Sequence, residues 1–289
     1  MLNRNSSFHV TIRAGFLVLV LALAGCAQAP VDRAASVERM YVFNCGEAHI
    51  PDVSPWSPGV NVGKPAVFSD NCYLIVHGKD LLLWDSGYSD TIAAKPEGLV
   101  GPRSTAFVTK TLAAQMAELG IKPEQVTRIG FSHTHPDHVG NANLFTSATV
   151  YMQQAEYDAA FGTEPAKFGF TPALYDKLRA STIVKLNGDH DVFGDGSALI
   201  LSTPGHTPGH QSLLVRLPRT GVVVLAGDAA HFKDNFDNRR VPSFNFSKEQ
   251  SVQSMDKLAR VVAAEHAQLW INHDSAQSAG IPHSPQFVD

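Results

Sequence analysis

Short apolar runs separated by glycine and polar turns recur along the chain, which is typical of β-strands. They cover residues 40–45, 71–76, 81–85, 126–132, 182–186, 198–202, 211–216, 222–225 and 268–271. Apolar residues instead recur every three or four positions in 105–119, and we expect a second helix at 248–264. Two β-rich halves flanked by helices predict the α/β class, as a four-layer αβ/βα sandwich.

Two further segments are expected to cover this sandwich. Residues 46–70 include four prolines, so they predict an ordered rim loop and neither a helix nor a central strand. Residues 153–180 predict a helical cover that breaks around 162–165.

Composition and charge bound the class of protein. The 289 residues are 44% hydrophobic and 17% charged, as in a folded globular protein, and residues 39–289 are expected to form a single domain. The net charge is −4, and the adjacent pair Arg239 and Arg240 lies close to Asp234 and Asp237. The sequence therefore predicts no nucleic-acid partner.

The N-terminus predicts export. Arg4 and Arg13 precede an apolar run, residues 14–24, that is too short to anchor the chain across a bilayer. The run ends in Leu-Ala-Gly-Cys, which resembles the bacterial lipobox. That resemblance implies a signal peptide at 1–25, a lipidated Cys26, a linker at 26–38 and a periplasm-facing protein anchored in the outer membrane. The alternative is an ordinary cleaved signal with an incidental cysteine.

Two other cysteines lie in predicted strands. Cys45 and Cys72 either pair in an oxidising periplasm or remain two small buried thiols. The sequence does not fix the distance between their Cα atoms, so both alternatives stay open.

One motif concentrates metal-binding side chains. His133-Thr134-His135-Pro136-Asp137-His138 holds four possible ligands directly after an apolar strand. Three more candidates, His206, Asp228 and His273, each follow a predicted strand, where sheets of this type gather ligands. All seven are expected to meet at one site.

The order of these motifs resembles the metallo-β-lactamase superfamily. The resemblance implies two Zn²⁺ per chain, with Asp228 and a hydroxide bridging them. It assigns the first zinc to His133, His135 and His206, and the second to Asp137, His138 and His273. It also implies that Asp85 orients ligand histidines from behind, while His210 either supports the site in this way or is structural. Manganese, iron and cobalt accept the same ligand types.

Such a pair of ions predicts a hydrolase. Two zincs lower the pKa of a shared water toward about 7 and polarise the carbonyl that it attacks. Asp137 is a candidate to carry the proton to the leaving group. The chain contains no G-x-S-x-G motif that would indicate a serine nucleophile.

Within the superfamily the motifs resemble those of N-acyl-homoserine lactonases. The resemblance covers Asn71-Cys72-Tyr73-Leu74-Ile75, Leu83-Trp84-Asp85-Ser86-Gly87, the His-rich motif, residues 203–210 and Gly227-Asp228-Ala229-Ala230. It implies a small-molecule lactone or ester substrate. Those lactonases usually carry Tyr three residues after the bridging aspartate, where this chain has His231, which either donates the same hydrogen bond or is structural. The predicted catalytic residues are therefore Asp137, Asp228 and His231.

Several alternatives remain at this level. The same centre could cleave another ester, a thioester, a phosphotriester or a β-lactam, or the metal could only stabilise a non-catalytic lipoprotein. An acyl chain requires an apolar trough, for which the candidates are Trp56 and Phe68 in the rim loop and Phe161, Phe168 and Phe170 in the cover. His190 is expected at the surface, and the oligomeric state is left open.

Overall fold

The computed structural model describes residues 1–2 and 36–289, and residues 36–289 lie in one compact unit. Cys26 and almost all of the predicted signal peptide and linker lie outside the described residues. Strand β1 begins at Val37, two residues before the expected start of the domain. Among the described residues, none of the helices combines the length and apolar character needed to cross a bilayer.

The strands form two sheets. The larger sheet has nine strands in the order β4-β5-β1-β2-β3-β6-β7-β8, with β14 also paired to β1. Its strands are β1 (Val37–Ile50), β2 (Ala66–His77), β3 (Asp80–Trp84), β4 (Leu99–Val100), β5 (Thr105–Phe107), β6 (Arg128–Gly130), β7 (Thr149–Gln153), β8 (Ile183–Leu186) and β14 (Phe287–Val288). The smaller sheet has the order β13-β12-β11-β10-β9. Its strands are β9 (His190–Asp191), β10 (Ala198–Ser202), β11 (Gln211–Leu217), β12 (Gly221–Leu225) and β13 (Gln268–Trp270).

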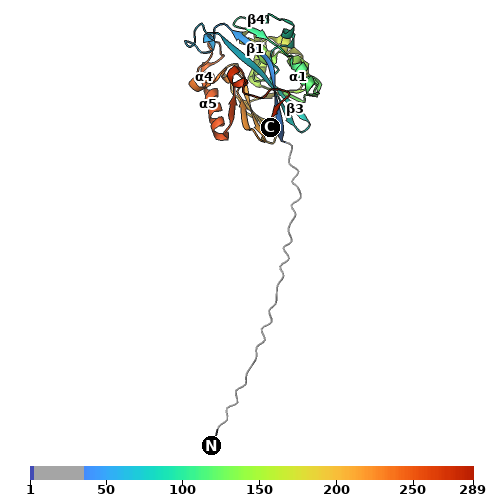
Figure 1. Cartoon of the computed structure of the whole chain (residues 1–289), viewed down its shortest axis with the longest axis vertical. Helices are drawn as coiled ribbons and strands as arrows, with labels where there is room; N and C mark the ends of the chain where they lie inside the picture. The colour runs from blue at the N-terminus through green and yellow to red at the C-terminus, as the bar shows by residue number, and fades with distance from the viewer. Residues whose placement is uncertain (3–35) are drawn as a thin grey trace. The chain divides into compact units, whose positions relative to one another are not determined.

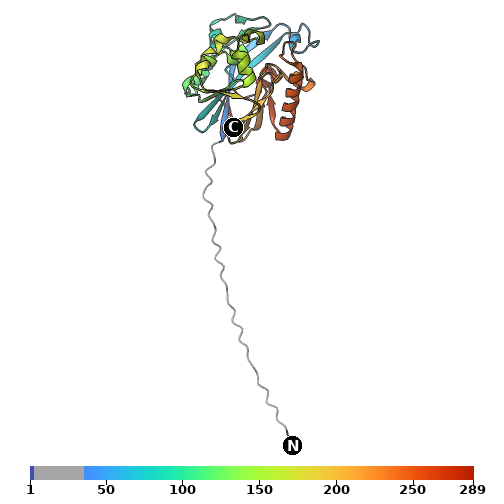
Figure 2. The ribbon, with the colours of Figure 1, turned by 180° about the vertical axis from the view of Figure 1, so that it is seen from behind.

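Helices cover the outer faces of both sheets. Helix α1 (Leu112–Glu118) lies on one side of the domain, and α4 (Lys233–Asn238) and α5 (Lys248–Glu265) lie on the other, with strands between them (Figures 1 and 2). The remaining helices are α2 (Pro136–Val139), α3 (Gln154–Phe161) and α6 (Ser275–Ser278). Short 3-10 turns are η1 (Ser54–Trp56), η2 (Asp90–Ala94), η3 (Pro123–Gln125), η4 (Ala142–Leu144), η5 (Pro165–Phe168), η6 (Pro172–Leu174), η7 (Asp176–Ala180) and η8 (Gly227–Ala229).

The alternation of side chains along β1 explains the layers. Met40 and Val42 pack between the sheets against strands of the smaller sheet, whereas Phe43 and Cys45 face the helices that cover the larger sheet. A third cluster, which includes Val224 and Leu258, joins the smaller sheet to α5. The predicted four-layer αβ/βα sandwich is confirmed.

Some predicted boundaries were wrong. The rim loop is shorter than residues 46–70, because β1 continues to Ile50 and pairs there with Ala66 at the start of β2. The prolines exclude a strand only within 51–65, where the Asp52 carboxylate accepts hydrogen bonds from the backbone N–H groups of Ser54 (2.9 Å) and Gly63 (3.0 Å). The helix expected at 105–119 begins only at Leu112, since residues 105–107 pair with β1.

Three further segments differ in detail from what the sequence predicts. The cover at 153–180 is one α-helix followed by 3-10 turns. Residues 233–238 form α4, a helix that the sequence analysis does not predict. His190 is half-buried in β9 with its ring 5.5 Å from that of Tyr151, so it is not a simple surface residue.

A disulfide joins two adjacent strands of the larger sheet. Cys45 in β1 and Cys72 in β2 are bonded, with their Cα atoms 5.9 Å apart. Both side chains are buried in the core between the sheet and its helices. Of the two alternatives left open by the sequence, the structure has the pair.

We predict that the Cys45→Ala/Cys72→Ala double variant loses about 3 kcal/mol of unfolding free energy, because the bond closes a loop of 27 residues in the unfolded chain. Urea unfolding of both proteins, with and without reductant, measures this. Reductant should destabilise the wild type and leave the double variant unchanged. An unfolding midpoint of the wild type that ignores reductant would contradict the prediction.

Candidate metal centre

Four loops from both sheets converge on one site. The His-rich motif follows β6 and forms α2, in the larger sheet. The smaller sheet supplies the others: His206 between β10 and β11, Asp228 in η8 after β12, and His273 after β13. These loops come from distant parts of the sequence, and they bring the seven predicted ligand side chains close together.

Three histidines form a first group. His135 Nδ1 lies 2.8 Å from His133 Nε2 and 3.0 Å from His206 Nε2. All three side chains are directed at one point with their nitrogens within 4.8 Å of one another, so together they could hold a metal ion. This is the predicted first-metal set.

A second group surrounds the other side of Asp228. Asp137, His138 and His273 also bring one ligand atom each within 4.8 Å of the others. Asp228 Oδ1 lies 3.1 Å from His273 Nε2 and 3.4 Å from His138 Nε2. The other oxygen, Oδ2, lies 3.3 Å from His206 Nε2 in the first group. The carboxylate thus presents one oxygen to each group, as a bridging ligand does.

The chemistry of these residues fits two divalent cations. His138 Nε2 and Asp228 Oδ1 are buried and have no hydrogen-bond partner. Buried polar atoms are costly without a partner, and imidazole and carboxylate are the ligands that zinc accepts. A cation held by the second group and Asp228 would satisfy both atoms.

Each histidine of the two groups is held in place by a hydrogen bond from the ring nitrogen that points away from the expected metal position. His138 Nδ1 donates to Asp85 Oδ2 (3.0 Å), and the Asp85 Oδ1 accepts from the Ser132 backbone N–H (2.6 Å). The other partners are Ser132 Oγ for His133 (3.1 Å), Phe168 O for His135 (2.9 Å), Asn245 Oδ1 for His206 (2.9 Å) and Ser69 O for His273 (2.8 Å). Such contacts set the orientation and tautomer of each ring, and Asp85 makes one of them, to His138.

His210 supports the bridging residue and not a metal directly. Burial lowers the pKa of His210 to about 3, so the ring is neutral. Its Nδ1 donates to the Thr203 carbonyl (3.0 Å), and its Nε2 accepts the backbone N–H of Asp228 (2.9 Å). The neighbouring Gly227 has φ +56°, and a Cβ there would lie 2.8 Å from His210 Nε2. Glycine is therefore required for this approach.

The histidines of the two groups differ in the direction in which their pKa values are shifted. Burial, assisted by neighbouring histidines, lowers the pKa of His133 and His206 well below the ordinary value. Burial opposes protonation of His273 too, but Asp228 and Asp137 outweigh it and raise its pKa to about 9. The carboxylates likewise raise the pKa of His138. Cations at this site would displace those protons, since imidazole binds metal in its neutral form.

His231 faces the same carboxylate. Its Nε2 lies 3.1 Å from Asp228 Oδ2, and its ring stacks on His273 with the centroids 5.4 Å apart. The side chain lines the cavity over the metal ligands and is 2% exposed. The structure therefore places His231 where it can reach a bound substrate.

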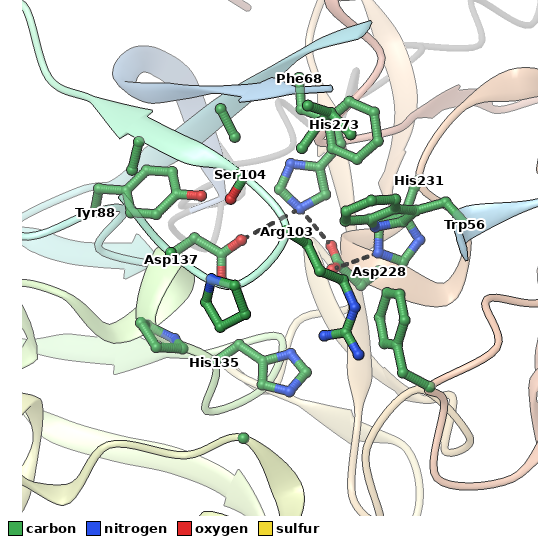
Figure 3. Close-up of a pocket in the computed structure, with 18 of the residues that line it drawn as sticks. Trp56, Phe68, Tyr88, Arg103, Ser104, His135, Asp137, Asp228, His231 and His273 are labelled. Carbon is green, nitrogen blue, oxygen red and sulfur yellow. Dashed lines mark ion pairs between the residues drawn. The ribbon is translucent and has the colours of Figure 1, made fainter. Parts of the chain in front are cut away.

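The ligands open into a cavity of about 450 Å³, here called the metal cavity. Trp56, Phe68, Phe244, Ile50 and Tyr88 contribute to its walls, and Figure 3 shows labelled residues around Asp137 and Asp228. Two of the predicted trough aromatics, Trp56 and Phe68, therefore line it. Phe161 and Phe170 instead pack against the core and pin the cover.

The sequence analysis missed a residue that supports the ligand loops. Glu156, at the start of α3, is 1% exposed and its carboxylate accepts three hydrogen bonds. They come from the backbone N–H of Thr134 (2.9 Å), from Thr207 Oγ1 (2.7 Å) and from the backbone N–H of Gly209 (2.9 Å). Thr134 lies between two ligands and Thr207 follows another, so Glu156 ties the two ligand loops together. A lone acid in a predicted helix gives no signal of this.

Comparisons with known proteins match most of the domain. The profile described as Metallo-beta-lactamase superfamily matches residues 66–265, which include every expected ligand except His273. An N-acyl homoserine lactonase from Bacillus sp. is 31% identical over 267 residues, covering 88% of this chain and 100% of that protein. The N-acyl homoserine lactonase AttM of Azorhizobium caulinodans is 33% identical over 229 residues, covering 75% of this chain and 86% of its own.

The fold of this chain is also similar to that of a solved lactone hydrolase. An N-acyl homoserine lactone hydrolase with the product N-hexanoyl-L-homoserine at its catalytic metal centre matches with a TM-score of 0.77 and 27% identity. The match covers 88% of this chain and 100% of the other.

We predict that Glu156→Gln weakens metal retention by roughly tenfold or more, as loss of a partner behind the ligands typically does. The uncharged amide holds the two ligand loops less strongly, because it presents one acceptor oxygen and not two. Zinc content after dialysis against a weak chelator measures the effect. Asp158→Asn, an exposed change on the same helix, is the control. Equal zinc retention in the two variants would refute the role of Glu156.

Proposed function

The chain belongs to the metallo-beta-lactamase superfamily, and we propose that it is a dizinc hydrolase that opens the ring of N-acyl homoserine lactones. Relatives with this activity in their names match across most of the domain. The observation that carries the proposal is the Asp228 carboxylate, whose two oxygens each face a separate set of ligand side chains. That arrangement suits two cations that share one aspartate.

The residues that would hold the ions are those of the two groups. We assign one zinc to His133, His135 and His206, the other to Asp137, His138 and His273, and Asp228 to both. When bound, such ions supply an activated water and polarise the carbonyl under attack. The outward hydrogen bonds of the histidines hold the ligand nitrogens in place before substrate binds.

His231 is assigned the role of hydrogen-bond donor to the lactone carbonyl oxygen. Its Nε2 already points at the Asp228 carboxylate on the cavity wall. An imidazole N–H there stabilises the negative charge that develops on that oxygen. Trp56 and Phe68 pack near its ring and keep it facing the cavity.

Asp137 is assigned the proton transfer. Its carboxylate lines the cavity, and its side chain is 23% exposed, more than any other carboxylate of the centre. It therefore reaches a bound ligand more easily than Asp228 does. Asp137 carries a proton to the ring oxygen that leaves, so the product is a hydroxy acid.

We also propose that the chain is exported and anchored to the outer membrane through lipid on Cys26. The disulfide between Cys45 and Cys72 supports an oxidising compartment. Cys26→Ser should move the protein from the membrane fraction to the soluble periplasmic fraction. Unchanged membrane retention of that variant would contradict the anchor.

The activity is tested with zinc-loaded protein on a panel of N-acyl homoserine lactones, simple esters, thioesters, phosphotriesters and a β-lactam. We expect the lactones to be preferred. His231→Phe should lower kcat for lactones by about 100-fold because the donor is lost, whereas His231→Tyr keeps a donor and should lose much less. His190→Phe, at a histidine outside the cavity, is the control. Lactones left intact by protein with two zincs would refute the proposed function.

A further inference from the structure

Arg103 is a cation that the proposed metal chemistry does not use. It lies in the turn between β4 and β5, with its guanidinium carbon 4.7 Å from the centroid of the Phe244 ring. Most other arginines of the described residues pair with a carboxylate, whereas Arg103 forms no ion pair within residues 36–289. A guanidinium held over a ring without a counter-ion remains able to bind an anionic ligand.

Two cavities meet at this side chain. The metal cavity adjoins a second space of about 300 Å³, here called the side cavity, whose lining includes Lys167, Phe168 and Phe246. Arg103 and His135 line both cavities. Figure 3 shows Arg103 among the labelled residues that line the metal cavity, with its side chain running downward in this view toward the level of His135. The guanidinium therefore lies on the path along which the acyl chain of a substrate bound at the metal centre would extend into the side cavity.

The charges that line these cavities favour an anion. Within the part of the chain that the structure describes, Asp137 and Asp228 are the carboxylates of the metal cavity, and no carboxylate lines the side cavity. Both aspartates are assigned to the metals. The remaining charged side chains, Arg103 and Lys167, are positive, and Lys167 pairs with the exposed Glu164 (2.6 Å). Arg103 is therefore the charged side chain of these cavities that has neither a metal assignment nor a counter-ion within residues 36–289.

We propose that the lactones preferred by this protein carry a carboxylate on the acyl arm, and that Arg103 is the residue that selects it. The apolar walls contact the methylene groups of that arm, and the guanidinium binds its carboxylate end. This inference rests on the proposed lactonase function. Ring opening consumes one water, and the carboxylate on the arm is unchanged by the reaction.

The test uses zinc-loaded protein and matched pairs of N-acyl homoserine lactones. The acyl chains have four, six or eight carbons and end either in a carboxylate or in its primary amide, which has nearly the same shape and no charge. We expect kcat/KM to favour the carboxylate by about tenfold at the best length, and the preference to fall as salt is raised.

Substitutions of Arg103 test whether this residue causes the preference for the carboxylate. Arg103→Met and Arg103→Gln should each remove it, and Arg103→Lys should keep part of it because the charge remains. Arg179→Met is the matched control: Arg179 also lies 4.7 Å from a ring centroid, that of Phe161, but lines neither cavity. That variant should retain the full preference.

The outcomes separate this inference from the proposed function. Equal kcat/KM for both members of every pair, or a preference that survives both Arg103→Met and Arg103→Gln, would overturn the role of Arg103 and leave the lactonase proposal intact. Failure to open any lactone, charged or neutral, would overturn the proposed function and this inference with it.

Discussion

The Asp228 carboxylate is the group on which the rest of this site depends. It is 3% exposed, and an ionised carboxylate so deeply buried is costly unless opposite charge surrounds it. One of its oxygens lies 3.1 Å from His273 and the other 3.3 Å from His206, so it links ligands that belong to different groups. Two cations on either side would neutralise it and complete the coordination of both groups.

The sandwich is what makes this convergence possible. The ends of β6, β12 and β13 meet where the two sheets adjoin, so short loops are enough to bring ligands from distant parts of the sequence together. Buried partners then fix the loops. Glu156 holds two ligand loops to each other, and His210 holds the backbone of Asp228. The positions of the ligand side chains are thus fixed by hydrogen-bonding groups that contact the ligand loops from the side away from the cavity, as is general for metal sites.

The sequence predicted the ligands because they are dense and each follows a strand, and it predicted the sandwich from the order of strands and helices. It failed where tertiary contacts decide the outcome. Residues 46–50 and 105–107 become strands because they pair with segments distant in sequence, which local patterns do not encode. Glu156 and Arg103 were missed for the same reason, since their roles depend on neighbours that only folding supplies.

The central claim is that two zinc ions at this centre are required to open a lactone. It is tested most directly by titrating metal-free protein with zinc while measuring both bound metal and turnover of an N-acyl homoserine lactone. The account predicts that turnover rises with binding and reaches its plateau at two zinc ions per chain. Full turnover by the metal-free protein, a plateau at one ion, or an inactive protein carrying two ions would contradict it.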